Sequence, residues 1–488
     1  MKDRETLNLI SKILLALFLV VATVFMIRIA TMAFLPAKFF YPLLLVIVIF
    51  AIFFGFFTFY RRSSRVTKTV FNIISIVLTV VMAFSTFKIN EIAGFLNKNL
   101  ENHKTYSVYN LIVKKDSKIE GLNDLNAPEI FTYEEPVKEI SDVKLTETVE
   151  NKVKNANLIF KDDLSSVMER VVRIADTTAL INNGTYESYI SVNEDYEEKI
   201  KIIATFEIEV EGKVGDENSN VTSDTIANTP FILFINGIDT RTDMMPAHSL
   251  SDVNILAAVN PKTKKILLVA IPRDTYVQLH GTTGLMDKLT HAGSRGGVNL
   301  SISTIEDFMG VKIDRYIRVN FNFVKDLVNS IGGITVTNYE NYTVIAADRA
   351  CKFTPGDNNV DGRCALAFAR ERKSYKTGDR HRGENQEQVI ERLVDKISED
   401  SNLIKNYSTI MNALNGSFDT NITTEDITSI VRLQLENMSG WKVESYNVNG
   451  AGAMARTNSY PGQDLYVLMP DVNTVTTARK KIEAILAE

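Results

Sequence analysis

The sequence predicts an α/β (α+β) domain with a mixed central sheet flanked by helices, preceded by transmembrane helices and a small mixed accessory domain. Three observations lead to this prediction. Long apolar runs are confined to residues 1–90. Strand and helix patterns occur together in residues 103–211, and they alternate more regularly from residue 229 onward. Such alternation is typical of layered α/β folds.

The composition limits the classes of function. The chain has 488 residues, enough for roughly two to four domains. The net charge is -5, so no global basic character favours a nucleic-acid partner. The two cysteines, Cys351 and Cys364, form neither a disulfide-rich scaffold nor a zinc-binding pattern.

Residues 1–90 contain three apolar runs, at 9–30, 39–60 and 70–87. Each is close to the roughly 20 residues that a helix needs to span a bilayer. The runs are too long and too often repeated for a cleaved signal peptide, and no small-residue cleavage site is evident. We therefore expect three transmembrane helices and a multi-pass protein of the cell membrane.

Basic residues predict the orientation in the membrane. By the positive-inside bias, the side that carries them is cytoplasmic. They lie at the start of the chain and between the second and third runs, as Lys2, Arg4, Lys12, Arg61, Arg62, Arg65 and Lys68. Three spans then place everything after about Lys88 outside the cell. An extracellular location argues against DNA binding and ATP-dependent chemistry.

Residues 103–211 are predicted to form a small extracellular accessory domain. Residues 106–113 are strand-like, 164–174 are helix-like, and Asn182-Asn183-Gly184 is a turn signal. No catalytic constellation is found here, so interaction or structural support is the expected role. Residues 212–228, rich in Gly, Asp, Asn, Ser and Thr, are predicted to be a linker.

Residues 229–400 show the clearest strand–helix alternation. The run 231–238 is almost continuously apolar, as expected for a central strand. Gly332-Gly333 is a typical stop after a helix. The other predicted elements are strands at 254–259, 265–271, 315–319 and 334–337, and helices that end near residues 309 and 330.

Polar side chains lie at the ends of the first three strands. Asp239 and Arg241 follow the first, Asp252 precedes the second, and Arg273 follows the third. Ligands of open α/β sheets bind beyond strand ends. Asp239 and Asp252 could therefore hold Mg²⁺ (or Mn²⁺), which prefers oxygen ligands and shares them with phosphate. Taken singly, each aspartate has the simpler explanation of an ordinary turn residue.

A short basic window lies between residues 369 and 388. It contains Arg370, Arg372, Lys373, Lys376, Arg380 and Arg382. The window runs into a helical pattern on which Gln386 follows Arg382 by one turn, on the same stripe as Ile390 and Leu393. Because arginine forks match pairs of phosphate oxygens, several of them on one pocket suit a pyrophosphate. A solvated charge run with i,i+4 pairs is the alternative.

Residues 401–488 are predicted to be a structural extension packed on the preceding domain. Thr423 with Asp426 indicates a helix start. A short strand is expected at 465–468 and a closing helix at 475–486.

Eight sequence blocks in residues 231–400 resemble the LytR-CpsA-Psr family, and their order is that of the family. They are Gly-Ile-Asp-Thr-Arg (237–241), Ser-Asp (251–252), Ala-Val-Asn-Pro-Lys-Thr-Lys-Lys (258–265), Ile-Pro-Arg-Asp-Thr-Tyr (271–276), Met-Asp-Lys-Leu (286–289), Ile-Gly-Gly-Ile (331–334), Val-Asp-Gly-Arg-Cys-Ala-Leu-Ala-Phe-Ala-Arg-Glu-Arg (360–372) and Gly-Asp-Arg-His-Arg-Gly-Glu-Asn-Gln (378–386). Three spans followed by an accessory domain resemble the capsule-associated, CpsA-like branch.

The resemblance implies a phosphotransferase on the outer face of a Gram-positive membrane. Family members move a glycopolymer, such as a capsular polysaccharide or a teichoic-acid-like polymer, from undecaprenyl pyrophosphate onto peptidoglycan. The lipid lies in a hydrophobic tunnel, and arginines with Mg²⁺ hold the pyrophosphate. The partners are then the lipid-linked glycopolymer, peptidoglycan and the membrane, with the machinery of capsule or wall synthesis as a further candidate and no nucleic acid.

The family's roles carry over position by position. Asp239 and Asp252 match the metal-side acids and are the candidate general bases. Asp379 would orient arginines. The phosphate-binding positions match Arg273, Arg370, Arg372, Arg382 and Gln386. Where the family commonly has an arginine before Ser-Asp, this chain has Leu250; either one contact is missing, or Arg241 or Arg380 supplies it.

Two other functions remain open from the sequence. A polyprenyl-pyrophosphate hydrolase would use the same clamp with water. A regulatory membrane protein of polymer synthesis would not need the clamp at all. Separately, Cys351 and Cys364 flank a Pro355-Gly356 turn segment in an oxidising compartment, which predicts a disulfide, with two buried thiols as the alternative.

Overall fold

The computed structural model describes residues 2–60, 62–97, 105–126, 128–133, 141–161, 163–210, 226–238, 245–346, 349–376, 378–399 and 416–488. The chain divides into two compact units. The first contains residues 1–101, 223–228 and 423–439, and the second contains residues 102–222, 229–422 and 440–488. The predicted extension at 401–488 is thus divided between the two units.

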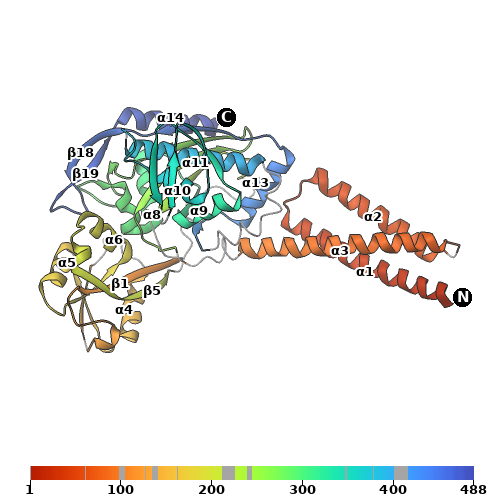
Figure 1. Cartoon of the computed structure of the whole chain (residues 1–488), viewed down its shortest axis with the longest axis horizontal. Helices are drawn as coiled ribbons and strands as arrows, with labels where there is room; N and C mark the ends of the chain where they lie inside the picture. Colours follow the sequence, from red (N-terminus) through yellow and green to blue (C-terminus); the bar gives the residue numbers. More distant parts are fainter. Residues whose placement is uncertain are drawn as a thin grey trace. The chain divides into compact units, whose positions relative to one another are not determined.

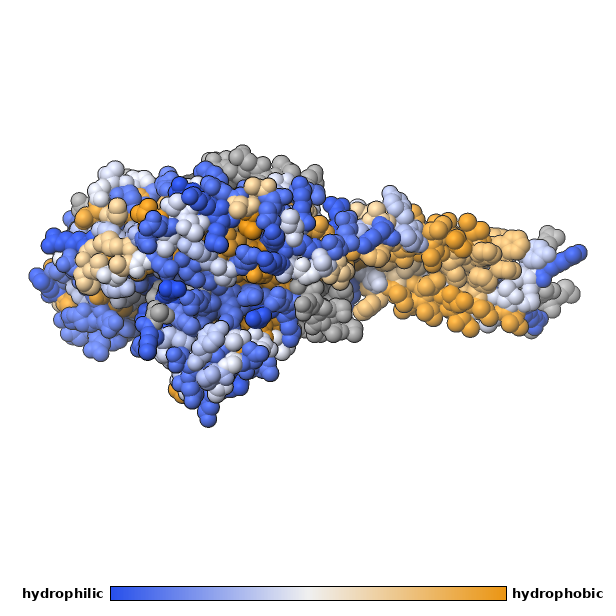
Figure 2. Space-filling model, turned by 90° about the horizontal axis from the view of Figure 1, so that it is seen from above, coloured by the Kyte–Doolittle hydropathy of each residue, from blue (hydrophilic) through white to orange (hydrophobic). Residues whose placement is uncertain are grey.

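Three long helices make up most of the first unit: α1 (Lys2–Met32), α2 (Ala37–Phe59) and α3 (Arg65–Leu96) (Figure 1). They contain apolar stretches of 28, 23 and 32 residues, long enough to cross a bilayer. Their surface is almost continuously apolar (Figure 2), as expected of helices that contact lipid. The predicted three apolar helices are confirmed.

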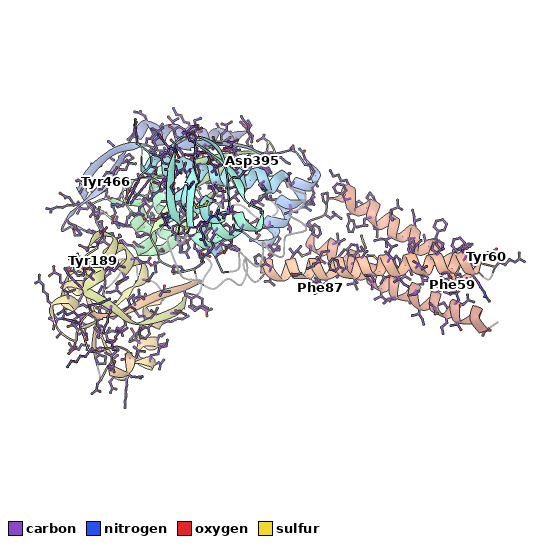
Figure 3. All side chains as sticks on the ribbon, in the orientation of Figure 1. Phe59, Tyr60, Phe87, Tyr189, Asp395 and Tyr466 are labelled. Atoms are coloured by element: carbon purple, nitrogen blue, oxygen red, sulfur yellow. A yellow bond between two sulfur atoms is a disulfide. The ribbon has the colours of Figure 1, made fainter. Side chains whose placement is uncertain are left out.

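The turn between α2 and α3 carries polar and aromatic groups. Phe59 and Tyr60 lie beside this turn, whereas Phe87 lies toward the other end of α3 (Figure 3). Lys68 is buried at the turn end, and its Nζ donates hydrogen bonds to Asn8 Oδ1 at 2.5 Å and to the Thr58 carbonyl at 3.2 Å. One of the basic residues that predict the orientation therefore also ties the three helices together.

The first unit also contains α13 (Thr424–Glu436). Its start is a capping box, as the sequence predicts. The Asp426 amide donates to Thr423 Oγ1 at 3.1 Å, and the Thr423 amide donates to Asp426 Oδ2 at 3.0 Å.

The accessory domain in the second unit is built on a five-stranded mixed sheet with the order β3-β2-β4-β1-β5. One predicted turn is wrong: the Asn182 side chain caps α6 by accepting a hydrogen bond from the Gly184 amide at 2.9 Å. The elements are β1 (Thr105–Lys114), η2 (Leu122–Asp124), β2 (Glu129–Tyr133), α4 (Ser141–Lys152), β3 (Asn157–Lys161), α5 (Leu164–Arg173), β4 (Thr178–Asn182), α6 (Asn183–Val192), α7 (Tyr196–Lys199) and β5 (Ile200–Val210).

The second sheet of this unit has six strands in the order β16-β11-β6-β7-β8-β17. The pairs β6–β11 and β8–β17 are parallel and the others antiparallel, so the sheet is mixed, as predicted. The two outer strands come from the C-terminal part of the chain. The strands are β6 (Phe231–Ile238), β7 (Ser251–Asn260), β8 (Lys265–Ala270), β11 (Arg315–Asn320), β16 (Phe418–Thr420) and β17 (Lys442–Asn447).

Helices cover both faces of this sheet. A large apolar core lies between β6, β7 and β8 and the helices α8 (Leu289–Met309) and α14 (Val472–Ala487). The other face carries α9 (Phe321–Ser330), α10 (Gly362–Arg370) and α11 (Asp379–Glu399). The remaining strands form small ribbons: β9 (Tyr276–Val277) with β10 (Asp287–Lys288), β12 (Ile334–Asn338) with β15 (Gly356–Val360), β13 (Tyr342–Ala346) with β14 (Arg349–Phe353), and β18 (Gly450–Arg456) with β19 (Asp464–Pro470).

The accessory domain contacts the six-stranded part through polar and aromatic residues. Asn182 Nδ2 and His248 Nδ1 lie 3.0 Å apart, and the Ser188 and Tyr460 hydroxyls lie 2.7 Å apart. Tyr460 also packs into the core of the accessory domain. The accessory domain is therefore joined to this part by side-chain packing as well as by the chain itself.

Candidate active site

A cavity of about 260 Å³ lies where β7, β8, α10 and α11 meet. It collects six of the side chains singled out from the sequence. Its lining residues are Asp252, Val253, Arg273, Phe321, Arg370, Arg372, Arg382 and Gln386, and we call it the arginine pocket. Lys373 and Lys376 are exposed and do not line it, as predicted. The basic window is therefore not a uniform charged surface.

Some predicted site residues cannot be placed. Asp239 and Arg241 lie outside the residues that the structure describes, as does the side chain of Asp379. Asp239 is the next residue in the sequence after Ile238, and Ile238 pairs with Ser251 in the sheet. The pairing brings the end of β6 to the start of β7, where Asp252 lies.

Arg273 is held between two carboxylates. Its Nη1 lies 2.5 Å from Asp252 Oδ1, and its Nε lies 3.8 Å from Asp274 Oδ1. Asp274 in turn pairs with Lys288 Nζ at 3.0 Å. The side chains of Arg273 and Asp252 are 21 % and 17 % exposed, so their ion pair is screened less than a surface pair. The pair fixes the Arg273 guanidinium at the wall of the pocket.

Arg370 is positioned by an aromatic ring. Its guanidinium carbon lies 4.1 Å from the centroid of the Phe321 ring, which is cation–π geometry. The sequence indicated no partner of this kind, because Phe321 lies 49 residues earlier (370 minus 321). Residues 370 and 372 are exposed overall, so this side of the pocket faces solvent.

Amide side chains of α11 join it to the end of α10. Asn385 Nδ2 donates to the Phe368 carbonyl at 3.0 Å, and Gln386 Nε2 donates to the Ala369 carbonyl at 3.3 Å. Carbonyls at a helix C-terminus have no partner within the helix, so these amides satisfy them. Gln386 therefore lines the pocket and also fixes the point from which Arg370 extends.

An apolar groove of about 210 Å³ opens from the arginine pocket. It confirms the predicted stripe on α11, whose Ile390 and Leu393 line it. The two spaces share Val253, Phe321, Arg370 and Gln386. The other lining residues are Ile235, Gly237, Ile317, Val319, Asn320, Phe323, Val324, Leu366, Ala369 and Val389. A charged pocket thus continues into a groove with almost no polar surface.

A third and much smaller cavity, of about 20 Å³, adjoins the other side of the arginine pocket. It shares Asp252, Arg273, Arg382 and Gln386 with that pocket and adds Asn254, Ala270, Ile271, Pro272, Arg380, Gly383, Asn447 and Val448. Arg380 Nε pairs with Glu384 at 3.2 Å. Leu250, which stands where the family commonly has an arginine, is buried. Arg380 is therefore the described residue that can make up for that departure.

A row of buried polar residues holds the start of β7. Across four neighbouring strands, Asp419, Arg318, Asn236 and Asn254 occupy one register position. Arg318 pairs with Asp419 at 3.1 Å, and Ser251 Oγ donates to Asn254 Oδ1 at 2.8 Å. Buried polar groups need such partners. The row fixes Ser251, the neighbour of Asp252, and the strand accordingly begins three residues earlier than predicted.

The side chains that could act as metal ligands provide only part of a metal site. Among the described residues, no three His, Cys, Asp or Glu side chains lie close enough together to hold a metal ion. Asp252 is the acid that lines the arginine pocket in this part of the chain. Because Mg²⁺ is commonly held by one or two carboxylates together with substrate phosphates, Asp252 fits such an ion.

Two titratable groups of α11 are affected by burial. Glu387 is only 2 % exposed, and burial raises the pKa of its carboxyl group to about 8. Nothing in the sequence marks this residue, because a glutamate on a helix ordinarily faces solvent. Burial also lowers the pKa of His381, whose ring stacks on Tyr375 with 3.6 Å between centroids, although Glu384 opposes this effect. His381 is therefore neutral at pH 7 and adds no charge to the site.

A disulfide supports the helix that carries Arg370. Cys351 on β14 is bonded to Cys364 on α10, with 5.5 Å between the two Cα atoms. The bond joins the β13–β14 ribbon to α10, which ends at Arg370.

The fold and the site define a mixed α/β protein with an arginine pocket that opens onto an apolar groove, in a chain whose first hundred residues contain three apolar helices. The sequence profile of the LytR_cpsA_psr family matches residues 211–481. The chain belongs to the LytR-CpsA-Psr family.

Several relatives carry functional names. The polyisoprenyl-teichoic acid–peptidoglycan teichoic acid transferase TagU of Enterococcus faecalis is 36% identical over 48% of this chain and 75% of that protein. TagV of Bacillus subtilis, named as the same kind of transferase, is 30% identical over 48% of this chain and 59% of its own length. Biofilm regulatory protein A of Streptococcus mutans is 33% identical over 49% and 61%. The crystal structure of B. subtilis TagV has 29% sequence identity and a TM-score of 0.46, covering 53% of this chain and 98% of that chain.

Proposed function

We propose that this protein is a membrane-anchored phosphotransferase that moves a glycopolymer from an undecaprenyl-pyrophosphate carrier onto peptidoglycan. The polymer would be a capsular polysaccharide or a teichoic-acid-like chain. The observation that carries the proposal is the continuity of the arginine pocket with the apolar groove. A polyprenyl pyrophosphate has the same two parts, an anionic head and an apolar chain. The names of the relatives support a transferase.

In this proposal, the groove and the arginine pocket bind different parts of the substrate. The polyprenyl chain lies along Ile390 and Leu393 in the groove. The pyrophosphate lies among Arg273, Arg370, Arg372 and Arg382, whose planar guanidinium groups bind phosphate oxygens in pairs. Asp239, Arg241 and Asp379 keep their proposed roles at the metal and phosphate side.

The reaction is a displacement at phosphorus. The oxygen of an acceptor hydroxyl forms a bond to the phosphorus that bears the polymer, the bond from that phosphorus to the bridging oxygen breaks, and polyprenyl monophosphate leaves. The hydroxyl proton passes to a carboxylate, for which Asp252 at the wall of the pocket is our candidate. The arginines stabilise the charge that spreads over the phosphoryl oxygens. A Mg²⁺ (or Mn²⁺) ion held by Asp252 and Asp239 would supply further charge neutralisation.

The location follows from the reaction. Peptidoglycan lies outside the membrane, so α1, α2 and α3 would anchor the chain with its larger unit on the extracellular side. The basic residues at the start of the chain and between α2 and α3 agree with this orientation, because positively charged segments favour the cytoplasmic side.

The pocket offers a matched pair of variants for the test. Arg372 lines it, whereas Lys373, the next residue, does not and is exposed. A charge-assisted contact that strengthens in the transition state contributes roughly 1.5–3 kcal/mol, so Arg372→Ala should lower the transfer rate roughly 10–100-fold. Arg372→Lys should restore little of the loss, because ammonium lacks the fork. Lys373→Ala should transfer at the wild-type rate.

The assay is transfer of a lipid-linked polymer to peptidoglycan by the full chain in detergent. Equal damage from Lys373→Ala and Arg372→Ala would contradict the pocket. Release of polymer without peptidoglycan, at the same rate as transfer, would make the protein a pyrophosphate hydrolase. If cells that carry Arg372→Ala kept normal polymer attachment, a regulatory role would replace the enzymatic one, as the name of the S. mutans relative suggests for that protein.

A further inference from the structure

The cavity of about 20 Å³ beside the arginine pocket has its own chemistry. It shares four residues with that pocket but only Gln386 with the apolar groove, so it lies on the side away from the groove. A space of this size admits about one water-sized group. It can therefore admit a single hydroxyl group.

Asn447, the last residue of β17, forms one wall of this cavity. Its Nδ2 donates a hydrogen bond to Glu387 Oε2 at 2.9 Å. This contact turns the carbonyl oxygen Oδ1 toward Gly383, another residue of the lining. Within the described part of the chain, no hydrogen bond uses Asn447 Oδ1. An acceptor atom is thus fixed at the wall of the cavity.

The absence of a side chain at Gly383 keeps the space open. A Cβ atom at this position would lie 3.1 Å from Asn447 Oδ1 and 3.7 Å from Ala270 Cβ. Gly383 lies in the second turn of α11, one residue after Arg382. A side chain here would fill the place beside the acceptor oxygen.

Glu387 is a positioning residue for Asn447. Its carboxyl group is almost completely buried behind Asn447 and does not line any of the three cavities described above. Burial of such a group costs free energy unless a partner compensates it. The Asn447 amide is that partner, and in the structure the contact leaves Asn447 Oδ1 directed toward Gly383.

The donors and acceptors around the cavity select the kind of group that it binds. Arg273 and Arg382 offer N–H donors, and Asn447 Oδ1 offers an acceptor. A phosphate oxygen cannot donate to Asn447, whereas a hydroxyl group both donates and accepts. We infer that this cavity is a subsite for one hydroxyl group of a sugar, with Asn447 as the residue that recognises it. The inference rests on the proposed function, which brings two sugars to the pocket: the first sugar of the polymer and the acceptor sugar of peptidoglycan.

The test uses Asn447→Ala, which removes the acceptor, and Gly383→Ala, which fills the cavity. Gly440→Ala is the matched control, because no heavy atom lies within 4 Å of a Cβ at Gly440. Loss of one neutral hydrogen bond should raise a KM roughly 3–10-fold, with a smaller change in kcat. Alanine is the better helix former, but its Cβ would crowd Asn447 Oδ1 at 3.1 Å, so the unfolding temperatures of both variants are measured to show that they fold.

The two substrates are varied separately in the transfer assay. A rise in the KM for peptidoglycan alone assigns the hydroxyl to the acceptor, and a rise in the KM for the lipid-linked polymer alone assigns it to the donor. If both variants fold and neither KM changes by more than about twofold, the cavity holds only water and the inference is wrong. A wild-type protein that transfers nothing would instead overturn the proposed function, and the subsite with it.

Discussion

Replacement of Glu387 by glutamine should make the larger unit more stable at neutral and alkaline pH. Glutamine keeps the shape of the side chain and can still accept the hydrogen bond from Asn447 Nδ2, which is 2.9 Å long in the native chain. It removes the ionisable group. Burial raises the pKa of Glu387 to about 8, and the nearby acids Glu384 and Glu391 add to this effect. Ionisation at higher pH therefore costs the native state free energy that glutamine avoids.

The size of the effect follows from linkage. The ordinary value for the carboxyl group is 4.5 and the folded value is about 8. The contribution of the protonated group to stability is therefore fully present below pH 4.5 and is lost as the pH rises toward 8. With about 1.36 kcal/mol for each pKa unit, Glu387→Gln should add less than about 1 kcal/mol at pH 5 and about 4 kcal/mol at pH 8.

The chain contains one tryptophan, Trp441, which directly precedes β17. Its fluorescence can therefore follow urea unfolding of the full chain in detergent between pH 5 and pH 8. Glu483→Gln, at an exposed position of α14, is the control and should change the unfolding free energy by a small amount that is independent of pH. Parallel curves for the wild type and Glu387→Gln across this range would refute a buried neutral carboxyl group.

Three further predictions test the surroundings of the site. A reporter that is active only outside the membrane should work when fused after Asn228 and fail after Ser64; the reverse would remove the cell-wall function. Unreduced, denatured protein should show no reactive thiols at Cys351 and Cys364, and two labelled thiols would disprove the disulfide. By loop-entropy models this disulfide stabilises the folded state by roughly 3 kcal/mol. EDTA should abolish transfer, and Asp252→Asn should change the dependence on Mg²⁺; full activity in excess EDTA would exclude the metal.

Residue spacing within one segment was enough to predict the part of the site that lies on α11. The spacing of Arg382, Gln386, Ile390 and Leu393 follows the helical period, so the sequence alone places them on one stripe. The same pattern could not show that this stripe lines a groove rather than a closed core. The groove depends on β11 and α9, whose positions are decided by pairing far along the chain.

The sequence did not predict the features that depend on contacts between residues far apart in the chain. Asn447 reaches Glu387 across 60 residues, because β17 pairs with β8 in the sheet. Asn182 reads as part of a turn until α6 is seen to begin there. Ser251 and Asp252 look like a loop, and only the buried partners Asn236 and Asn254 make them part of β7. In each case a side chain far away in the sequence decides the local structure.

The order of the three spaces supports the proposed displacement. The apolar groove and the small cavity have only Gln386 in common, and the arginine pocket lies between them. In phosphoryl transfer the attacking and leaving oxygens lie roughly in line on opposite sides of the phosphorus. A lipid in the groove places its phosphate, the leaving group, at one end of the arginine pocket. If the hydroxyl group in the small cavity belongs to the acceptor sugar, that sugar lies at the other end, beside Asp252, which lines both the cavity and the pocket. Asp252 can therefore receive a proton from the side on which an attacking oxygen must arrive.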